Sequence, residues 1–364
     1  MQLVAYGAQD IYLTGNPQIT FFKVVYRRHT NFAMEAVQQT VNGTVGDATR
    51  VSCTIARNGD LLGRIWLELS ETGTITHDHA GHALIEYVEL EIGGQLIDKQ
   101  YGDWMEIWSQ LTHDSASRTK LTRLLDNSGS YAYVPLQFWF CRNPGLALPL
   151  IALQYHEVKL SIQFAASGNI GGGNCNGCNV WCDYIYLDTD ERRRFAQVSH
   201  EYLIEQVQYN GQETFTGDKN IELRFNHPVK ELVWVHDVAA TMGKFDYSSA
   251  GTQFLSKAKL QLNGHDRFRE READYFRLVQ PYQHHSGGHD QDSTDASAAG
   301  FVYCYSFALK PEEHQPSGTC NFSRIDNAVL NLTHATGTSY VRVYAVNYNV
   351  LRVMSGMGGL AYSN

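Results

Sequence analysis

No stretch of the 364-residue sequence is long and apolar enough to cross a membrane. The longest apolar run, Gly145–Leu153, contains a proline and is far shorter than the roughly 20 apolar residues that a membrane-spanning helix needs. The first residues, MQLVAYGAQDIYL, also lack the basic start and apolar core of a secretory signal peptide. We therefore expect synthesis in the cytoplasm and seven free cysteine thiols, with the Asn-x-Ser/Thr sequons at Asn42, Asn321 and Asn331 as chance occurrences.

Positive charge is also scarce, because 29 Lys and Arg residues face 38 Asp and Glu residues, which gives a net charge of −9. A protein that wraps nucleic acid neutralises phosphates with Lys and Arg, so this balance argues against direct nucleic-acid binding. The sequence has no P-loop, Gly-x-Ser-x-Gly or His-Glu-x-x-His motif. The run Arg269–Glu272 is typical of a charged surface or a subunit contact. We predict no catalytic residue, no cofactor-binding residue, no metal ligand and no cofactor.

The sequence does contain a strand–turn–strand–helix pattern that occurs twice. Leu84–Trp108 combines alternating apolar residues, a Gly-Gly turn, a second strand and an amphipathic helix, and Lys257–Val279 repeats it about 170 positions later. Four further pairs recur in the same order at offsets of 170 (204 − 34) or 168 (233 − 65): Met34–Gln38 with Ile204–Gln208, Val51–Ile55 with Ile221–Phe225, Ile65–Leu67 with Val233–Val235, and Leu160–Ile162 with Leu330–Leu332. A period of this length has the size of a domain, so we predict two tandem copies of one domain.

Each half consists of short strands divided by turns, with few helices, which is typical of a β-sandwich or barrel. We expect an amino-terminal arm at residues 1–20, a first sandwich at 21–199 and a second at 200–364. Strands are expected at 21–28 and 133–142 among others, and short helices near Arg118–Leu125 and after the capping residue Asp188. Five tryptophans in periodic segments are predicted to lie in the core: Trp66, Trp104, Trp108, Trp139 and Trp234.

Several long segments resemble the major capsid proteins of large icosahedral double-stranded DNA viruses of the nucleocytoplasmic type, and those of algal viruses in particular. The segments are Ala5–Lys23, Glu89–Asp98, Pro144–Leu160, Phe307–Ala328 and Tyr348–Asn364. They cover nearly the whole chain in order. The resemblance implies an all-β double jelly roll, that is, two eight-stranded β-sandwiches in tandem, which agrees with the duplication.

The resemblance also implies a structural role rather than catalysis. Members of this family form trimers of roughly hexagonal outline that tile the capsid over an internal membrane. We therefore expect a homotrimer in the virion shell, with neighbouring capsomers and minor capsid and penton proteins as its partners. Hexagonal tiling needs about six similar contacts around each block, which three chains with two sandwiches each can supply. The arm is expected to dock on a neighbour or a minor protein at the inner side of the capsid.

Three cysteines near a glycine-rich segment raise the question of a metal. Cys175-x-x-Cys178 followed by Cys182 has thiol spacing suited to zinc, but a closed zinc site needs four ligands and no fourth is near. We expect a flexible loop with incidental thiols, and Cys182 in the core.

Histidines offer the alternative function, a cupin-like metal-dependent enzyme on a β-sandwich. His77-x-His79 followed by Glu86 and Gly93 is similar to the cupin metal motif, although the spacing between His79 and Glu86 is longer than that motif allows. A second group, His284, His285 and His289, lies in a polar segment that we expect at the surface. A catalytic metal at either group is the less favoured hypothesis.

Overall fold

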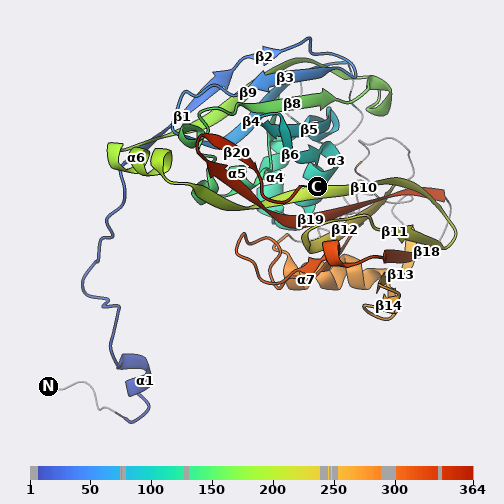
Figure 1. Cartoon of the computed structure of the whole chain (residues 1–364). Helices are drawn as coiled ribbons and strands as arrows, with labels where there is room; N and C mark the ends of the chain where they lie inside the picture. Colours follow the sequence, from blue (N-terminus) through green and yellow to red (C-terminus); the bar gives the residue numbers. More distant parts are fainter. Residues whose placement is uncertain are drawn as a thin grey trace.

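The computed structural model describes residues 7–73, 75, 79–126, 131–237, 245, 247, 253–287, 301–334 and 338–363. Its strands form four antiparallel sheets, two in each half of the chain, and the halves lie against each other (Figure 1). The fold is a double jelly roll, which confirms the predicted fold class.

The first half contains two sheets that enclose a hydrophobic core. One has the order β1 (Phe32–Gln39), β9 (Asn174–Leu187), β4 (Leu61–Thr72) and β7 (Ala132–Pro135). The other has the order β2 (Val41–Asn42), β3 (Arg50–Thr54), β8 (Val158–Phe164), β5 (Ile85–Ile92) and β6 (Gln95–Tyr101).

The second half repeats this arrangement. One sheet has the order β10 (His200–Thr216), β19 (Thr338–Met354), β12 (Pro228–Asp237) and β16 (Val302–Ser306), with β17 (Cys320–Asn321) beside β12 and β20 (Met357–Leu360) beside β19. The other has the order β11 (Lys219–Glu222), β18 (Ala328–His334), β13 (Leu255–Leu262) and β14 (His265–Asp266), with β15 (Arg271–Glu272) beside β13. Matching the strands of the two halves one by one gives the same order in both pairs of sheets, so the predicted duplication is present in the topology.

The duplication is in register in one pair of sheets. Leu90 of β5 lies opposite Leu160 of β8, and Leu260 of β13 lies opposite Leu330 of β18. Leu260 follows Leu90 by 170 positions, and Leu330 follows Leu160 by the same number, as the sequence predicts.

In the other pair of sheets the sequence match is displaced, as two tryptophans show. Trp66 is half-buried on the outer side of β4, whereas Trp234 is fully buried and packs against Phe276. On β12 the neighbouring residue Val233 lies opposite Tyr344, and the Tyr344 hydroxyl contacts Asp103 of the first half. Trp234 therefore points the other way, into the core of the second half. Because side chains alternate along a strand, a displacement of one residue reverses the face. The pairing of Trp66 with Trp234 is therefore wrong, and the other four tryptophans are buried as predicted.

Short helices fill the connections. The α-helices after the arm are α2 (Ala80–Ala83), α3 (Gly102–Thr112), α4 (Ser115–Leu125), α5 (Trp139–Arg142), α6 (Thr189–Gln197) and α7 (Gln280–His284), and a π-helix, η4 (Tyr275–Val279), runs directly into α7. Single 3-10 turns are η1 (Pro144–Leu146), η2 (Leu150–Ala152), η3 (Ser167–Asn169) and η5 (Phe322–Arg324). Helices α4 and α6 confirm the predictions, and the Asp188 side chain caps α6 by accepting a hydrogen bond from the Thr189 amide (2.7 Å).

The strand predicted over residues 133–142 is mostly wrong. Only its first residues belong to a strand, β7, and the chain then turns into α5. Phe138, Trp139 and Phe140 are consecutive and all fully buried. In a strand the Trp139 ring would point away from the rings of Phe138 and Phe140. The turn into a helix instead allows all three rings to be buried in the core.

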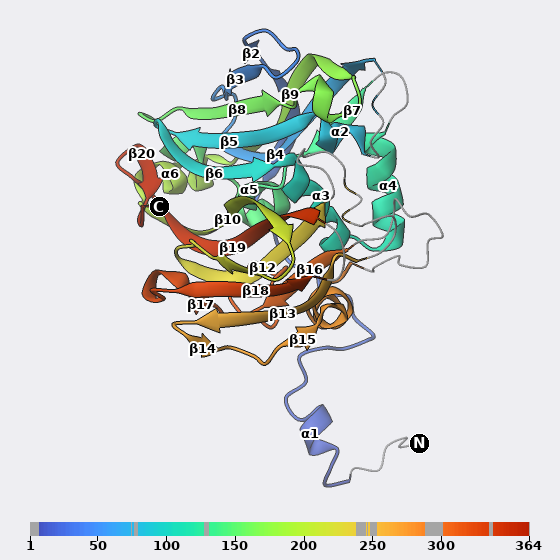
Figure 2. The same ribbon diagram turned by 90° about the vertical axis from the view of Figure 1, so that its right-hand side faces the viewer.

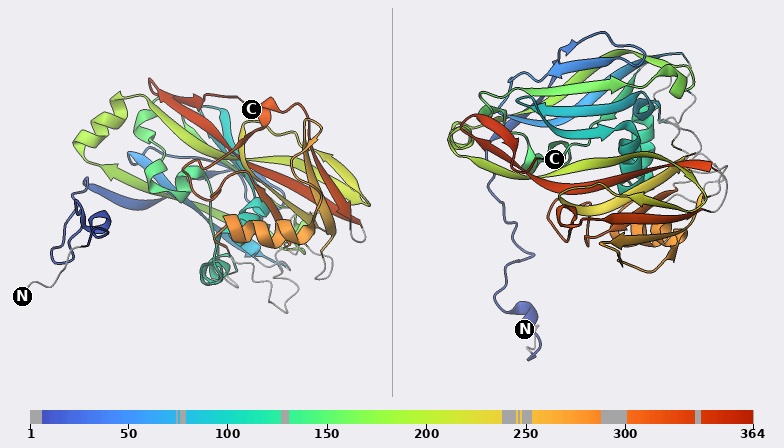
Figure 3. Two further views of the ribbon diagram at one scale, coloured as in Figure 1. Left: turned by 90° about the horizontal axis from the view of Figure 1, so that it is seen from below. Right: turned by 45° about the vertical axis from the view of Figure 1, so that its right-hand side comes forward.

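The amino-terminal segment that precedes the sheets extends to residue 31, and its residues 7–31 contain no strand. Residues 7–31 are exposed almost throughout, form only the short helix α1 (Ile11–Thr14) and project from the body of the molecule (Figures 1 and 3). The strand predicted at 21–28 is absent. None of the described strands pairs with this segment, so its apolar pattern alone does not make it a strand of a sheet.

Candidate assembly surfaces

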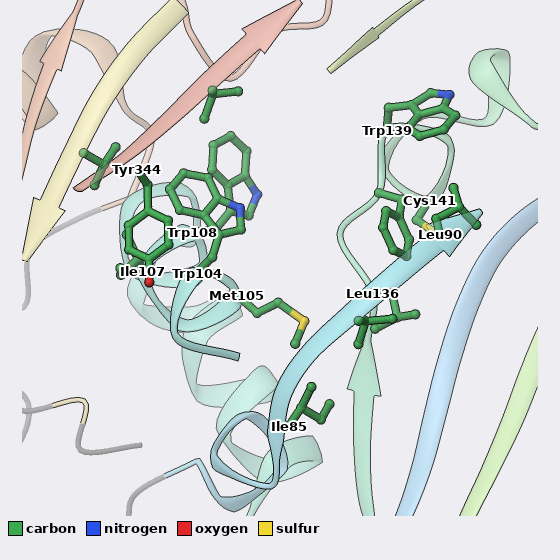
Figure 4. Packing of buried hydrophobic residues seen from close by; sticks show 14 of the residues in the cluster. Ile85, Leu90, Trp104, Met105, Ile107, Trp108, Leu136, Trp139, Cys141 and Tyr344 are labelled. Carbon is green, nitrogen blue, oxygen red and sulfur yellow. The ribbon is translucent and has the colours of Figure 1, made fainter. Parts of the chain in front are cut away.

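Helix α3 lies in the seam between the two halves (Figure 2). It begins after the β5–β6 hairpin, and ten of its eleven residues are buried. Trp104 packs against Tyr344 of β19 with ring centroids 5.4 Å apart, as Figure 4 shows. A helix that is buried on all sides belongs to the interior, so the seam is part of one continuous core rather than a loose contact.

A buried ionic cluster centred on Asp103 joins α3 to the second half. Arg342 contacts the Asp103 carboxylate through Nε (3.1 Å) and the Asp237 carboxylate through Nη2 (3.0 Å). The hydroxyls of Tyr344 (2.7 Å) and Tyr247 (2.5 Å) donate to Asp103. Burial and the Asp103 charge raise the pKa values of both tyrosines well above their usual range, so both remain neutral donors.

A second cluster lies around Glu205 of β10. Its carboxylate contacts Arg142 of α5 (2.7 Å) and Lys230 of β12 (2.8 Å). Burial alone would raise its pKa, but Arg142, His314 and Lys230 together lower the pKa of Glu205 to about 2. The glutamate is therefore ionised and holds α5 of the first half to β10 and β12 of the second.

Asp98 of β6 covers the open edge of β10. Its Oδ1 accepts a hydrogen bond from the Val207 amide (3.1 Å), and Gln100 Nε2 donates to its Oδ2 (3.1 Å). Burial raises the pKa of Asp98 to about 6. The unpaired edge of the second half's sheet is thus covered by a carboxylate of the first half.

The histidines do not form the cupin arrangement. His79 Nδ1 hydrogen-bonds to the buried Glu106 (2.8 Å), as does His82 Nδ1 (2.9 Å), whereas Glu86 is exposed on β5. Burial opposes the charged imidazole, but Glu106 raises the pKa of His79. His77 lies outside the described residues. The carboxylate that contacts His79 is therefore Glu106 of α3, not Glu86. No spacing in the sequence indicated this contact.

The surface prediction for the second histidine group is wrong for His285. Its side chain is fully buried between Glu231 (Nε2 to Oε2, 2.9 Å) and Glu312 (Nδ1 to Oε1, 3.0 Å). These carboxylates raise the pKa of His285 well above its usual range despite burial. His284 Nδ1 donates a hydrogen bond to the Leu309 carbonyl near the surface (3.0 Å), and His289 lies outside the described residues.

The cysteines are not in a flexible loop. Cys175, Cys178 and Cys182 all lie on β9, buried and unbridged, and the Cys175 thiol donates to the Gly177 carbonyl (3.3 Å). Burial raises the pKa of Cys175 to about 12 and those of the other two further. Within the described ranges, no group of three or more His, Cys, Asp and Glu side chains is placed to hold a metal ion. In the same ranges no helix has the length and apolar character needed to cross a membrane.

Two neighbouring grooves open beside the seam. One, of about 540 Å³, is lined by Trp66, Trp108 and basic side chains of Arg64 and Lys120, and the other, of about 230 Å³, by Trp139 and Glu205. Arg142 and Glu312 line both. The run Arg269–Glu272 is exposed in the single chain, and Lys257 lies near Glu272 (3.6 Å). A charged surface and a subunit contact both remain predictions for it.

Exposed apolar side chains gather at three places that sequence reasoning missed. They lie along the arm (Phe21, Phe22, Val24, Val25 and Tyr26), at the start of β1 (Phe32 and Met34), and on η4 and α7 (Leu278, Val279 and Tyr282). Isolated exposed apolar residues are ordinary, but clusters of them mark interaction surfaces.

Comparisons with known proteins agree with a structural role. The model of the major capsid protein N-terminus matches residues 20–188, and that of the large eukaryotic DNA virus major capsid protein matches residues 191–359. The chain is 54% identical to the major capsid protein of Pyramimonas orientalis virus and 47% identical to that of Paramecium bursaria Chlorella virus 1, in each case over 100% of this chain and 99% of the relative. The crystal structure of PBCV-1 VP54 is similar, with a TM-score of 0.84 and 43% identity over 95% of this chain and 100% of that one.

The two jelly rolls with the same strand order, together with these matches, define a double jelly-roll capsid protein of viruses. The chain belongs to the family of large eukaryotic DNA virus major capsid proteins, with algal-virus members among its relatives. The matched family and these relatives are structural capsid proteins, which favours the structural role over the cupin-like alternative.

Proposed function

We propose that three copies of this chain form a homotrimer with pseudo-hexagonal outline, and that these capsomers tile an icosahedral shell. One observation carries the proposal. The two halves have the same strand order and are locked side by side by a buried seam, so each chain supplies two similar blocks. Three chains then supply the six blocks that a hexagonal lattice needs, and closed symmetric oligomers are the usual arrangement.

The molar mass in solution tests the trimer. Three chains of 41.0 kDa give 3 × 41.0 = 123 kDa by light scattering, and negatively stained particles should have a hexagonal outline. A protein that remains at one or two chains at micromolar concentration contradicts the proposal.

The division into an arm at 1–20, a first jelly roll at 21–199 and a second at 200–364 belongs to the same proposal. In it, the chain is made in the host cytoplasm and resides in the virion shell over an internal membrane. Its partners are neighbouring capsomers and minor capsid and penton proteins, without direct contact to nucleic acid.

The arm has an assembly role in this proposal. Residues 7–20 bury no large apolar side chain against the body, so they add little to the fold of one chain. Deleting residues 1–20 is expected to leave the trimer intact and to block capsid formation, measured by sedimentation of assembled particles. A truncated chain that builds normal capsids would contradict this role.

A further inference from the structure

Residues 21–28, with the sequence FFKVVYRR, combine exposed apolar side chains with positive charge. The three basic residues, Lys23, Arg27 and Arg28, are all exposed. The five apolar residues are between 72% and 99% exposed: Phe21, Phe22, Val24, Val25 and Tyr26. Isolated exposed apolar residues are ordinary, but a cluster of this density marks an interaction surface.

The charge around this segment differs from that of the rest of the chain. Asp and Glu occupy 38 of the 364 positions, or about one in ten, yet residues 11–34 contain neither. The same stretch contains Lys23, Arg27 and Arg28, so it is basic within a chain whose net charge is −9. A partner that fits this composition carries negative charge and also accepts apolar side chains.

The segment stands clear of the two jelly rolls. Phe32 is the first described residue that pairs with a neighbouring strand, and it lies opposite Leu187 of β9. Residues 7–31 project away from both halves (Figures 1 and 3). An extended chain spans at most about 3.6 Å per residue, so the 32 − 21 = 11 steps from Phe32 to Phe21 cover up to roughly 40 Å. Residues 21–28 can therefore reach a separate surface while the jelly rolls stay in place.

We propose that residues 21–28 bind the surface of an anionic lipid bilayer. Phe and Tyr rings and Val side chains enter the boundary between head groups and acyl chains, and Lys and Arg are attracted by negatively charged head groups. Nucleic acid fits this segment less well, because Val24 and Val25 cannot stack on bases as aromatic rings do. The contact does not need the proposed trimer, since each chain carries the whole segment. It also lies outside residues 1–20, which have the proposed assembly role.

Co-sedimentation of the full-length protein with lipid vesicles tests the contact. Vesicles of phosphatidylcholine with about one third phosphatidylserine should bind the parent, whereas vesicles of phosphatidylcholine alone should bind it far more weakly. The charge variant carries Lys23→Gln, Arg27→Gln and Arg28→Gln. Each basic residue near an anionic membrane contributes about fivefold to binding, so this variant should bind roughly 100-fold more weakly. The ring variant, Phe21→Ser with Phe22→Ser, should bind at least about tenfold more weakly.

Two controls separate this segment from the rest of the chain. The matched charge control removes three exposed cations from the jelly rolls, through Lys120→Gln, Arg224→Gln and Lys310→Gln, and should bind like the parent. Deletion of residues 1–20 leaves residues 21–28 in place, so it should also keep vesicle binding. Every variant should retain the parent's circular dichroism spectrum, because the substituted side chains are exposed.

Three results would overturn the lipid contact: a parent that does not bind the anionic vesicles, charge and ring variants that bind as tightly as the parent, or an equal loss in the matched charge control. A parent that binds a DNA duplex but not the vesicles would assign the segment to nucleic acid instead. If neither is bound and the ring variant blocks capsid formation, the partner is a protein. Light scattering on the same samples keeps the trimer separate, because a 41.0 kDa parent that binds the vesicles refutes the trimer and leaves the lipid contact standing.

Discussion

Asp98 is expected to make the protein more stable in mild acid than at neutral pH. Its carboxyl is buried in the seam beside the Val207 amide, and burial raises its pKa from 3.8 to about 6. A group whose pKa is higher in the folded state binds its proton more tightly there. Its contribution is therefore complete below the unfolded pKa and is lost as the pH rises from about 4 to about 6. A difference of about two pKa units corresponds to about 3 kcal/mol of unfolding free energy.

The variant Asp98→Asn isolates this effect, because the amide oxygen still accepts the Val207 hydrogen bond but does not titrate. Urea unfolding of parent and variant at one protein concentration, from pH 4 to pH 8, gives the difference in unfolding free energy. That difference should move in favour of the variant by about 3 kcal/mol between pH 4 and pH 7 and stay constant above. The exposed Glu86→Gln is the control and should show no such change. A difference that does not depend on pH, or that moves toward the parent as the pH rises, would refute the reasoning.

Three further outcomes follow from buried groups. Arg342→Met leaves the Asp103 and Asp237 carboxylates buried without their cation and should lower the unfolding free energy by about 3–5 kcal/mol, measured by urea unfolding; a loss below 1 kcal/mol would show that the cluster does not hold the seam. Cys182→Ser places a hydroxyl in the fully buried interior of β9 and should cost about 1–3 kcal/mol, whereas no loss would mean that the site is hydrated. In the native protein at pH 8, Cys320 should react with a thiol reagent before the six buried cysteines, and equal rates for all seven would contradict the burial described.

The sequence predicts the duplicated fold well because strands with one inner and one outer face have alternating apolar residues. This alternation recurs at the same offset in both halves. The match holds in the sheets that contain β5 and β13, where Leu90 and Leu260 have the same partners. It is displaced in the sheets that contain β4 and β12 because every residue of β12 after Pro228 is buried, so alternation no longer marks the inner face. The strand predicted over 21–28 is wrong for the opposite reason: its apolar pattern pairs with none of the strands that the structure describes.

The ionic clusters could not be predicted from local patterns. Asp103, Arg342 and Asp237 are far apart in the sequence, and each alone is typical of a surface residue. The same holds for His285. Its neighbours Ser286 and Gly287 are typical of a loop, whereas its partner Glu231 lies on β12, far away in the sequence. Only the topology brings these residues together, so burial of a charge is visible in the structure and not in the sequence.

The seam within the chain is rich in charge, whereas the exposed clusters at the start of β1 and on η4 and α7 are apolar, and the difference has a physical basis. Burying Asp103 and Arg342 costs desolvation that the pair repays only with good geometry. Two halves of one chain meet at a high effective concentration, so their contact tolerates this cost, and a charged cluster excludes displaced packings. Separate copies must instead pay for association in translational freedom, which buried apolar area offsets more reliably than ion pairs. Phe32, Met34 and Tyr282 supply such area without a buried charge. On this argument charge suits the contact between the two halves of one chain, and apolar area suits the contacts between copies in the proposed trimer.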